Sequence, residues 1–322
     1  MRLPRTLLWL LLPLLTAALA AAAVYLQRER IAGAYLAAGQ RMLTQGQFRE
    51  ALGDFTWAIL FTPRHPAPYA ARARAYEALG LPAAALADLD AAIRRDPRRA
   101  DLLFWRGRLH GGPLERYRRA IRDFDDVLHL EPGHALAFYH RGHAYDQINN
   151  PHQAVKDYTR ALALQPALAE AWRERAHIHG RLRDAPRQIA DLTELLRLEP
   201  GDLAAREQRG RALLAERAWA EALADLEHVI RADPGARLHF LRGTAHLNLG
   251  HYRAAIADFT AVVRSNRFRV AAYYNRARAY EALGQPERAL ADWAAVCELQ
   301  AAGQSEACYL VERLPQRRAS AP

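Results

Sequence analysis

Residues 135–166 read ALAFYHRGHAYDQINNPHQAVKDYTRALALQP, and their pattern recurs along most of this 322-residue chain. The stretch predicts two amphipathic helices, the first carrying Phe138 and the second Tyr158. Asn149-Asn150-Pro151 separates them, and Pro166 ends the second, because proline lacks an amide proton and clashes with the preceding turn. Neither helix can bury its apolar face alone, so we expect each pair to stack on the next copy.

The recurrence is clearest as one aspartate, followed by a large apolar residue, in each predicted second helix. Successive aspartates are 33 to 35 residues apart, and prolines close six of the eight units. The aspartates are Asp54, Asp88, Asp123, Asp157, Asp191, Asp225, Asp258 and Asp292, and the prolines are Pro63, Pro97, Pro132, Pro166, Pro200 and Pro234. A small residue recurs early in the second helix, except that the fifth unit has Gln188 there.

Period, helix punctuation and residue types together resemble the tetratricopeptide repeat family over residues 31–301, in eight tandem units. The resemblance implies an all-α fold, a right-handed α-solenoid of helix-turn-helix repeats. Two units depart in length. The third has one extra residue around Gly111-Gly112-Pro113, and the seventh is one residue short between Pro234 and Gly243.

Arginines form a second ladder, at one position in the first helix of units two to eight. They are Arg72, Arg106, Arg141, Arg175, Arg209, Arg242 and Arg276. The first unit has Ala38 at this position. We predict that each Asp pairs with the Arg of the following unit, which leaves Asp292 over, and that both ladders are structural.

The N-terminal segment, residues 1–30, is different in character. Residues 6–26 form an uncharged, Leu- and Ala-rich run, preceded by Arg2 and Arg5. Such a run is long enough to cross a bilayer as an uncleaved anchor, and a cleaved signal peptide is the alternative. Both interpretations place the rest of the chain across the membrane, in the periplasm of a bacterial-type envelope.

The C-terminal end follows the last repeat. Residues 302–314 predict a cap helix that covers the open end of the solenoid, and residues 315–322 predict a disordered tail. Cys297 and Cys308 are the two cysteines. In an exported protein they are compatible with a disulfide that ties the cap to the last repeat; two small buried residues are the alternative.

The net charge is +10, and Lys156 is the one lysine among 45 basic residues. Acidic residues are interleaved with the arginines in every unit, which favours the composition bias of a GC-rich genome over a surface that binds polyanions. We find no zinc-protease histidine pair, phosphate-binding glycine loop or Cys-x-x-Cys pair. We therefore expect no enzyme activity, no cofactor and no metal site; His140, His143 and His177 are interpreted as ordinary polar residues rather than a weak metal site.

The family resemblance implies that partner proteins bind in the concave groove lined by the first helices. The residues expected to line it are Arg74, Phe104, Arg108, Tyr139, His143, Arg173, His177, Arg211, Phe240, Tyr274 and Arg278. Aromatic anchors flanked by arginine suit an extended peptide or helix with apolar and acidic groups. The sequence thus predicts a membrane-anchored scaffold for proteins, and the alternative is a basic solenoid that binds nucleic acid or another polyanion. It does not predict the oligomeric state.

Overall fold

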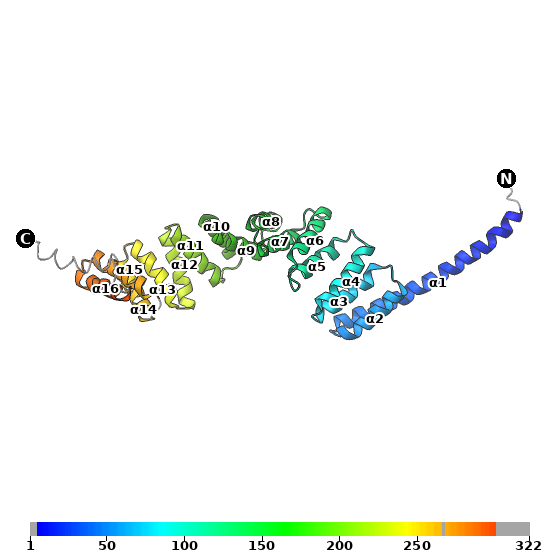
Figure 1. Cartoon of the computed structure of the whole chain (residues 1–322), viewed down its shortest axis with the longest axis horizontal. Helices are drawn as coiled ribbons and strands as arrows, with labels where there is room; N and C mark the ends of the chain where they lie inside the picture. Colours follow the sequence, from blue (N-terminus) through cyan, green and yellow to red (C-terminus); the bar gives the residue numbers. More distant parts are fainter. Residues whose placement is uncertain (1–4, 266–267, 301–322) are drawn as a thin grey trace, which may run out of the picture. The chain divides into compact units, whose positions relative to one another are not determined.

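The computed structural model describes residues 5–265 and 268–300, with side chains from residue 23 onward apart from that of Ala236. This part of the chain is all-helical, and Figure 1 shows its consecutive helices arranged as antiparallel hairpins. The helices are α1 (Arg5–Thr44), α2 (Phe48–Phe61), α3 (Pro66–Ala78), α4 (Pro82–Arg95), α5 (Ala100–Gly111), α6 (Tyr117–Leu130), α7 (Ala135–Gln147), α8 (Pro151–Leu164), α9 (Ala169–Arg181), α10 (Ala185–Leu198), α11 (Leu203–Ala215), α12 (Trp219–Ala232), α13 (Ala236–Asn248), α14 (Tyr252–Arg264), α15 (Arg269–Ala282) and α16 (Pro286–Leu299). We number the pairs α1–α2 to α15–α16 as repeats 1 to 8. They divide into two compact units, Met1–Gln165 with repeats 1 to 4 and Pro166–Pro322 with repeats 5 to 8.

Within a repeat, a small residue on the first helix meets a large residue on the second. In repeat 3 a methyl group on Gly107 would lie 2.7 Å from the Phe124 ring, so only glycine allows this approach. Gly39 faces Phe55 in the same way, and Gly243 faces Phe259. The glycine and the aromatic ring therefore complement each other in volume, which locks the hairpin at close packing.

The hairpin turns share one backbone feature. The residue at the same turn position has a positive φ in all eight repeats: Gly46, Gly80, Glu115, Asn149, Arg183, Arg217, Gly250 and Gly284. Such a residue ends a helix by redirecting the chain, and glycine or asparagine takes this conformation at the least cost. Repeats 3, 5 and 6 keep a bulky residue there, in left-handed conformation.

Within a unit, the apolar core extends across neighbouring repeats. In the first unit one cluster includes Leu89 of repeat 2, Phe124 of repeat 3 and Ala144 of repeat 4, each at most 1% exposed. Each helix pair thus buries its apolar face against the next pair, which is how a stack of repeats obtains a core.

The two length changes fall in connections. In repeat 3 the Arg116 amide donates to the His110 carbonyl, six residues back, whereas the matching bond in repeat 4 joins Asn150 to Tyr145, five residues back. The extra residue is therefore accommodated in the α5–α6 turn. In repeat 7 the missing residue shortens the α12–α13 connection to three residues, against four between α10 and α11.

Helix α1 continues without a break from Arg5 into the first repeat. Among the helices in the described part of the chain, none combines the length and the apolar character needed to cross a bilayer. The expected cap helix at residues 302–314 and the tail at residues 315–322 lie outside the described residues.

Candidate functional site

The two ladders meet within each repeat. Seven arginines each form an ion pair with the Asp of their own repeat, at 2.6 to 2.8 Å. The pairs are Arg72–Asp88, Arg106–Asp123, Arg141–Asp157, Arg175–Asp191, Arg209–Asp225, Arg242–Asp258 and Arg276–Asp292. The predicted pairing with the following repeat is therefore wrong: Asp88 binds Arg72 and not Arg106. The reason is the hairpin, which packs the first and second helices of one repeat directly together.

The third guanidinium nitrogen reaches back to the preceding repeat. Arg72 Nη1 donates to Thr56 Oγ1 over 3.1 Å, and Arg106 Nη1 contacts Asp90 over 2.8 Å. The acceptor lies two residues after the ladder Asp, a position that the sequence prediction missed. Each of these arginines therefore joins two repeats while the buried Asp neutralises its charge.

The aspartate without an arginine is Asp54 and not Asp292. Repeat 1 has Ala38 at the ladder position, and Asp54 Oδ2 is buried with no hydrogen-bond partner among the described residues. Asp292 instead binds Arg276. This corrects the predicted end of the ladder.

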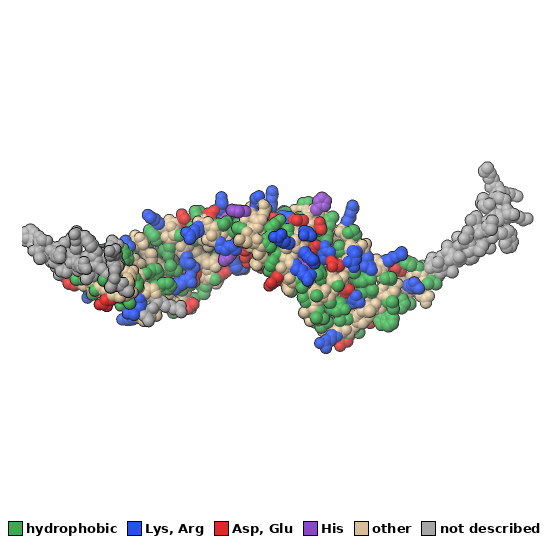
Figure 2. Space-filling view, viewed as in Figure 1, with side chains coloured by type: hydrophobic (Ala, Val, Ile, Leu, Met, Phe, Trp, Pro, Cys, Tyr) green, Lys and Arg blue, Asp and Glu red, His purple; other side chains and the backbone are tan. Residues whose placement is uncertain are grey.

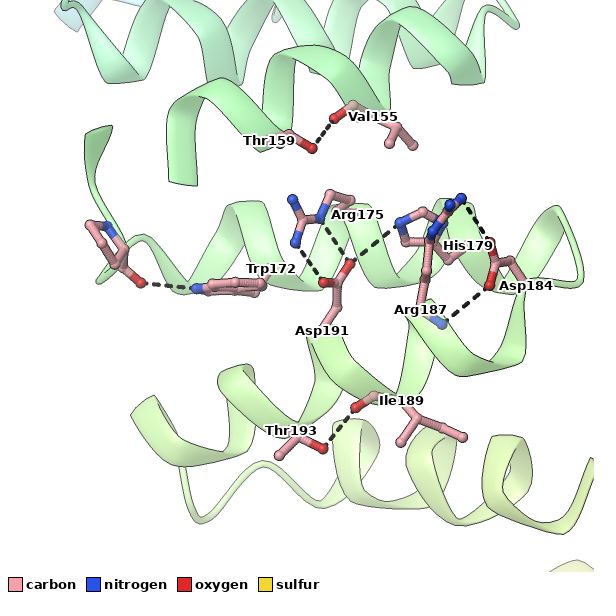
Figure 3. A network of polar contacts seen from close by, with 11 residues as sticks. Val155, Thr159, Trp172, Arg175, His179, Asp184, Arg187, Ile189, Asp191 and Thr193 are labelled. Carbon is pink, nitrogen blue, oxygen red and sulfur yellow. Dashed lines mark hydrogen bonds and ion pairs between the residues drawn. The ribbon is translucent and has the colours of Figure 1, made fainter. Parts of the chain in front are cut away.

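Repeats 3 and 5 each place a buried histidine beside their Arg–Asp pair, four residues after the arginine. Figure 3 shows His179 Nε2 pointing toward Asp191, at 3.7 Å, next to Arg175. His110 occupies the same position in repeat 3, 4.0 Å from Asp123. Burial lowers the pKa of His110 to about 4, and nearby arginines act in the same direction. Both histidines are therefore neutral core residues at physiological pH.

The predicted binding residues of the first unit gather around a pocket between α5 and α7. It has a volume of about 300 Å³, and its lining includes Arg108, Tyr139 and His143. Gly111 and Gly112 also line it, so the unusual turn of repeat 3 leaves this space open. The pocket thus combines an exposed cation with a half-buried aromatic ring.

Two other predicted residues of this unit are already engaged. Phe104 packs against Phe124 and His140, with ring centroids 5.8 and 5.5 Å apart, so it forms the aromatic wall behind the pocket. Arg74 lies over the Trp105 ring, 5.8 Å from its centroid.

Burial lowers the pKa of His140 to about 4, and the Arg108 charge acts in the same direction.

In the second unit, His177 and Arg211 line a larger cavity beside the α9–α10 turn. Arg173 does not join them, because its guanidinium is bound to Glu199 and Asp202. Arg278 is exposed on α15. The predicted set therefore separates into free cations and cations that are already neutralised.

The aromatic members of that unit already pack against other rings. Phe240 stacks on Phe268 at 5.8 Å, and Tyr274 meets Trp293 edge-on at 4.8 Å. Both rings are only partly exposed.

Among residues with described side chains, no group of three or more His, Cys, Asp or Glu is arranged to hold a metal ion. Cys297 lies in α16, whereas Cys308 lies outside the described residues. The disulfide therefore stays a prediction.

Comparison with known families supports the repeat assignment directly. One tetratricopeptide repeat model matches residues 70–110 and 240–305, and a second matches residues 135–168. The chain contains tetratricopeptide repeats. Tetratricopeptide repeat protein 6 of Homo sapiens is 30% identical over 125 residues, which are 38% of this chain and 24% of that protein. The chain thus matches about a quarter of that relative's length.

Solved structures share the tetratricopeptide fold. A repeat protein from Parabacteroides merdae aligns with a TM-score of 0.52 and 21% identity, over 78% of this chain and 99% of that one. Pseudomonas aeruginosa pilF aligns with a TM-score of 0.53 and 19% identity, over 66% of this chain and 96% of that one. YrrB is described as a TPR protein with an unusual peptide-binding site. It aligns with a TM-score of 0.50 and 22% identity, over 57% of this chain and 94% of that one. At these identities the likeness concerns the fold.

The tetratricopeptide pattern located the first-helix positions but not the residues that complete each pocket. Arg183 and Gln208 line the second-unit cavity and were absent from the predicted set. The signal available in the sequence was Gln188, the long residue at a position where the other repeats have alanine.

Proposed function

We propose that this chain is a non-enzymatic scaffold that binds a peptide or helix of a partner protein on the face formed by the first helices of its repeats. The observation that carries the proposal is the α5–α7 pocket, where Arg108, Tyr139 and His143 surround about 300 Å³ of open space. A pocket of this size suits one anchoring side chain, and buried anchors supply most of the free energy of binding at protein interfaces.

The distribution of charge supports a protein partner over a nucleic acid. Basic and acidic side chains are interspersed over the face seen in Figure 2. A nucleic-acid surface needs cations gathered along a continuous path. YrrB, which shares the fold, is described as having a peptide-binding site, and this agrees with a peptide partner here.

We further propose that residues 6–26 hold the chain in a bacterial cell envelope, with the repeats in the periplasm. The support is the uncharged run of Leu and Ala that follows Arg2 and Arg5. Protease digestion of intact and lysed spheroplasts tests it. Digestion of the repeats from outside, with residues 6–26 retained in the membrane fraction, is the expected result. Protection until lysis contradicts it, and a soluble, shortened chain indicates a cleaved signal peptide.

The scaffold function is tested by site-specific photo-crosslinking in cells. A crosslinking amino acid at Tyr139 should capture a discrete partner, because this side chain lines the pocket. The same amino acid at Lys156, on the second helix of the same repeat and outside the pocket lining, is the matched control. Equal capture at both positions, or none at Tyr139, contradicts binding on the first-helix face.

A further inference from the structure

The second unit contains an open basic cavity at the α9–α10 turn. Its volume is about 630 Å³. The lining includes four basic residues and two amides, His177, Arg181, Arg183, Arg211, Gln188 and Gln208. Among the described residues, no carboxylate belongs to the lining. The cavity therefore presents concentrated positive charge within a surface where both signs are otherwise mixed.

Two arginines of the lining, Arg183 and Arg211, differ from those of the ladder. In the same repeats, Arg175 and Arg209 are neutralised by Asp191 and Asp225. No hydrogen bond or ion pair joins the side chain of Arg183 or Arg211 to another residue in the described part of the chain. Their donors are therefore available to a ligand.

Part of the cavity wall is specific to repeat 5. A methyl group on Gly180 would lie 2.7 Å from Gln188 Nε2, so the amide side chain lies directly against this glycine. Alanine at position 188, as in the other repeats, would remove the amide group from the wall. Gln188 thus adds neutral hydrogen-bonding capacity to the cationic lining.

Arg183 stands at the turn position that five other repeats fill with glycine or asparagine. Its φ of +58° lies in the left-handed region, which glycine adopts more readily than a residue with a side chain. Replacing this arginine by glycine therefore removes a charge from the cavity without harming the turn.

We propose that this cavity binds the acidic side chains of a partner peptide, a proposal that rests on the scaffold function above. Guanidinium groups pair with carboxylates through two parallel hydrogen bonds, and Arg183 and Arg211 supply two such groups. Ala185, Ala212 and Ala215 form apolar wall beside them, which suits the methylene groups of glutamate. The cavity is larger than one carboxylate, so it accommodates neighbouring acidic residues of a single segment.

The composition of the lining favours a peptide over a nucleic acid. Single-stranded nucleic acids bind through bases stacked on aromatic rings. Within the described part of the chain, the lining contains no Phe, Tyr or Trp, and His177 is its one ring. A cavity that offers positive charge but no Phe, Tyr or Trp ring for stacking a base suits a flexible acidic peptide segment.

The test uses the full chain and fluorescein-labelled synthetic peptides. One peptide combines Glu with Leu and Ala, and its twin has Gln in place of every Glu. Fluorescence anisotropy at about 50 and about 300 mM NaCl measures both affinities, because salt screens interactions between exposed charges. At the lower salt concentration we expect the acidic peptide to bind at least about tenfold more tightly than its Gln twin. A hydrogen bond to a charged group stabilises a complex more than a neutral one does, by an amount that corresponds to about a tenfold change in Kd.

Two double variants separate the cavity from net charge. Arg183→Gly with Arg211→Gln removes two cations of the cavity. Arg217→Gly with Arg253→Gln removes two exposed cations outside the cavity lining, one at the matching turn position of repeat 6 and one on α14. We expect the cavity variant to weaken binding of the acidic peptide at least about tenfold, and the control variant to weaken it less than about twofold. Thermal unfolding followed by circular dichroism checks that both variants are folded.

Equal weakening by both variants, or equal binding of the Glu and Gln peptides, overturns the proposal. The proposal is also overturned if a DNA oligonucleotide binds more tightly than the acidic peptide and the cavity variant weakens that DNA binding. If Tyr139 crosslinks a partner whose binding the cavity variant leaves unchanged, the scaffold function stands and the acidic cavity does not. If the acidic peptide binds as expected while Tyr139 captures nothing, the acidic cavity stands and the α5–α7 pocket is not a binding site.

Discussion

Arg141 and Asp157 form a bidentate ion pair inside one repeat, with Nε–Oδ2 and Nη2–Oδ1 both at 2.7 Å. The remaining nitrogen, Nη1, contacts Asp125 of the preceding repeat at 2.6 Å. Asp157 is 5% exposed, whereas the Asp125 side chain is 50% exposed. One guanidinium therefore holds a hairpin closed and links two hairpins, through carboxylates in very different environments.

This geometry predicts that the loss of Arg141 and the loss of its exposed partner Asp125 have unequal costs in stability. Arg141→Ala leaves the buried Asp157 carboxylate uncompensated and should destabilise the fold by about 3 kcal/mol. Asp125→Asn removes an exposed partner and should cost less than about 1 kcal/mol. Urea unfolding of the full chain measures both. Similar losses for the two variants would show that the buried pair has no special role.

The empty position in repeat 1 can be filled. Ala38→Arg places a guanidinium where the other seven repeats have one, facing the unpaired Asp54 Oδ2. We expect a gain of about 1 kcal/mol in unfolding free energy, typical of a hydrogen bond to a charged group at a partly exposed site. The gain should vanish in the Ala38→Arg, Asp54→Asn double variant; a gain that persists there contradicts the pairing explanation.

Hairpin packing predicts opposite effects for two glycines. Gly107→Ala puts a methyl group 2.7 Å from the Phe124 ring and should destabilise by about 1–3 kcal/mol through overpacking. Gly53, also inside a helix, has open space around it, so Gly53→Ala should stabilise by about 0.5–1 kcal/mol. Chemical denaturation of both variants tests the pair. A stabilising Gly107→Ala would show that Phe124 can move aside.

The buried His140 predicts a pH dependence of stability. Its pKa is about 4 in the folded chain, against an ordinary value of 6.5, because burial and the Arg108 charge disfavour the imidazolium. As the pH falls below about 6.5, the unfolded chain takes up the proton first, so stability falls between about pH 6.5 and 4 and changes no further with this group below that range. His140→Phe should flatten the slope of urea midpoint against pH in this window. An unchanged slope would show that other groups cause it.

The sequence was sufficient for the repeating helical hairpins, because helix ends and close contacts are encoded locally. Pro82 and Pro151 lie in the first turns of α4 and α8, and Gly80 ends the preceding hairpin arm, as residue chemistry alone requires. The Asp and Arg ladders were also visible as positions. Their pairing was not: Arg106 lies 18 residues after Asp88 and 17 before Asp123, nearly midway along the chain.

Only the tertiary structure decided which partner each arginine takes and which cations stay free. The tight hairpin brings Arg106 to Asp123 and leaves its third nitrogen for Asp90 of the preceding repeat. Arg173 and Arg211 are both first-helix arginines of the predicted groove, yet Arg173 is bound by Glu199 and Asp202 while Arg211 lines an open cavity. Periodicity places a side chain on a face, but its charge is neutralised or available according to which helix packs beside it.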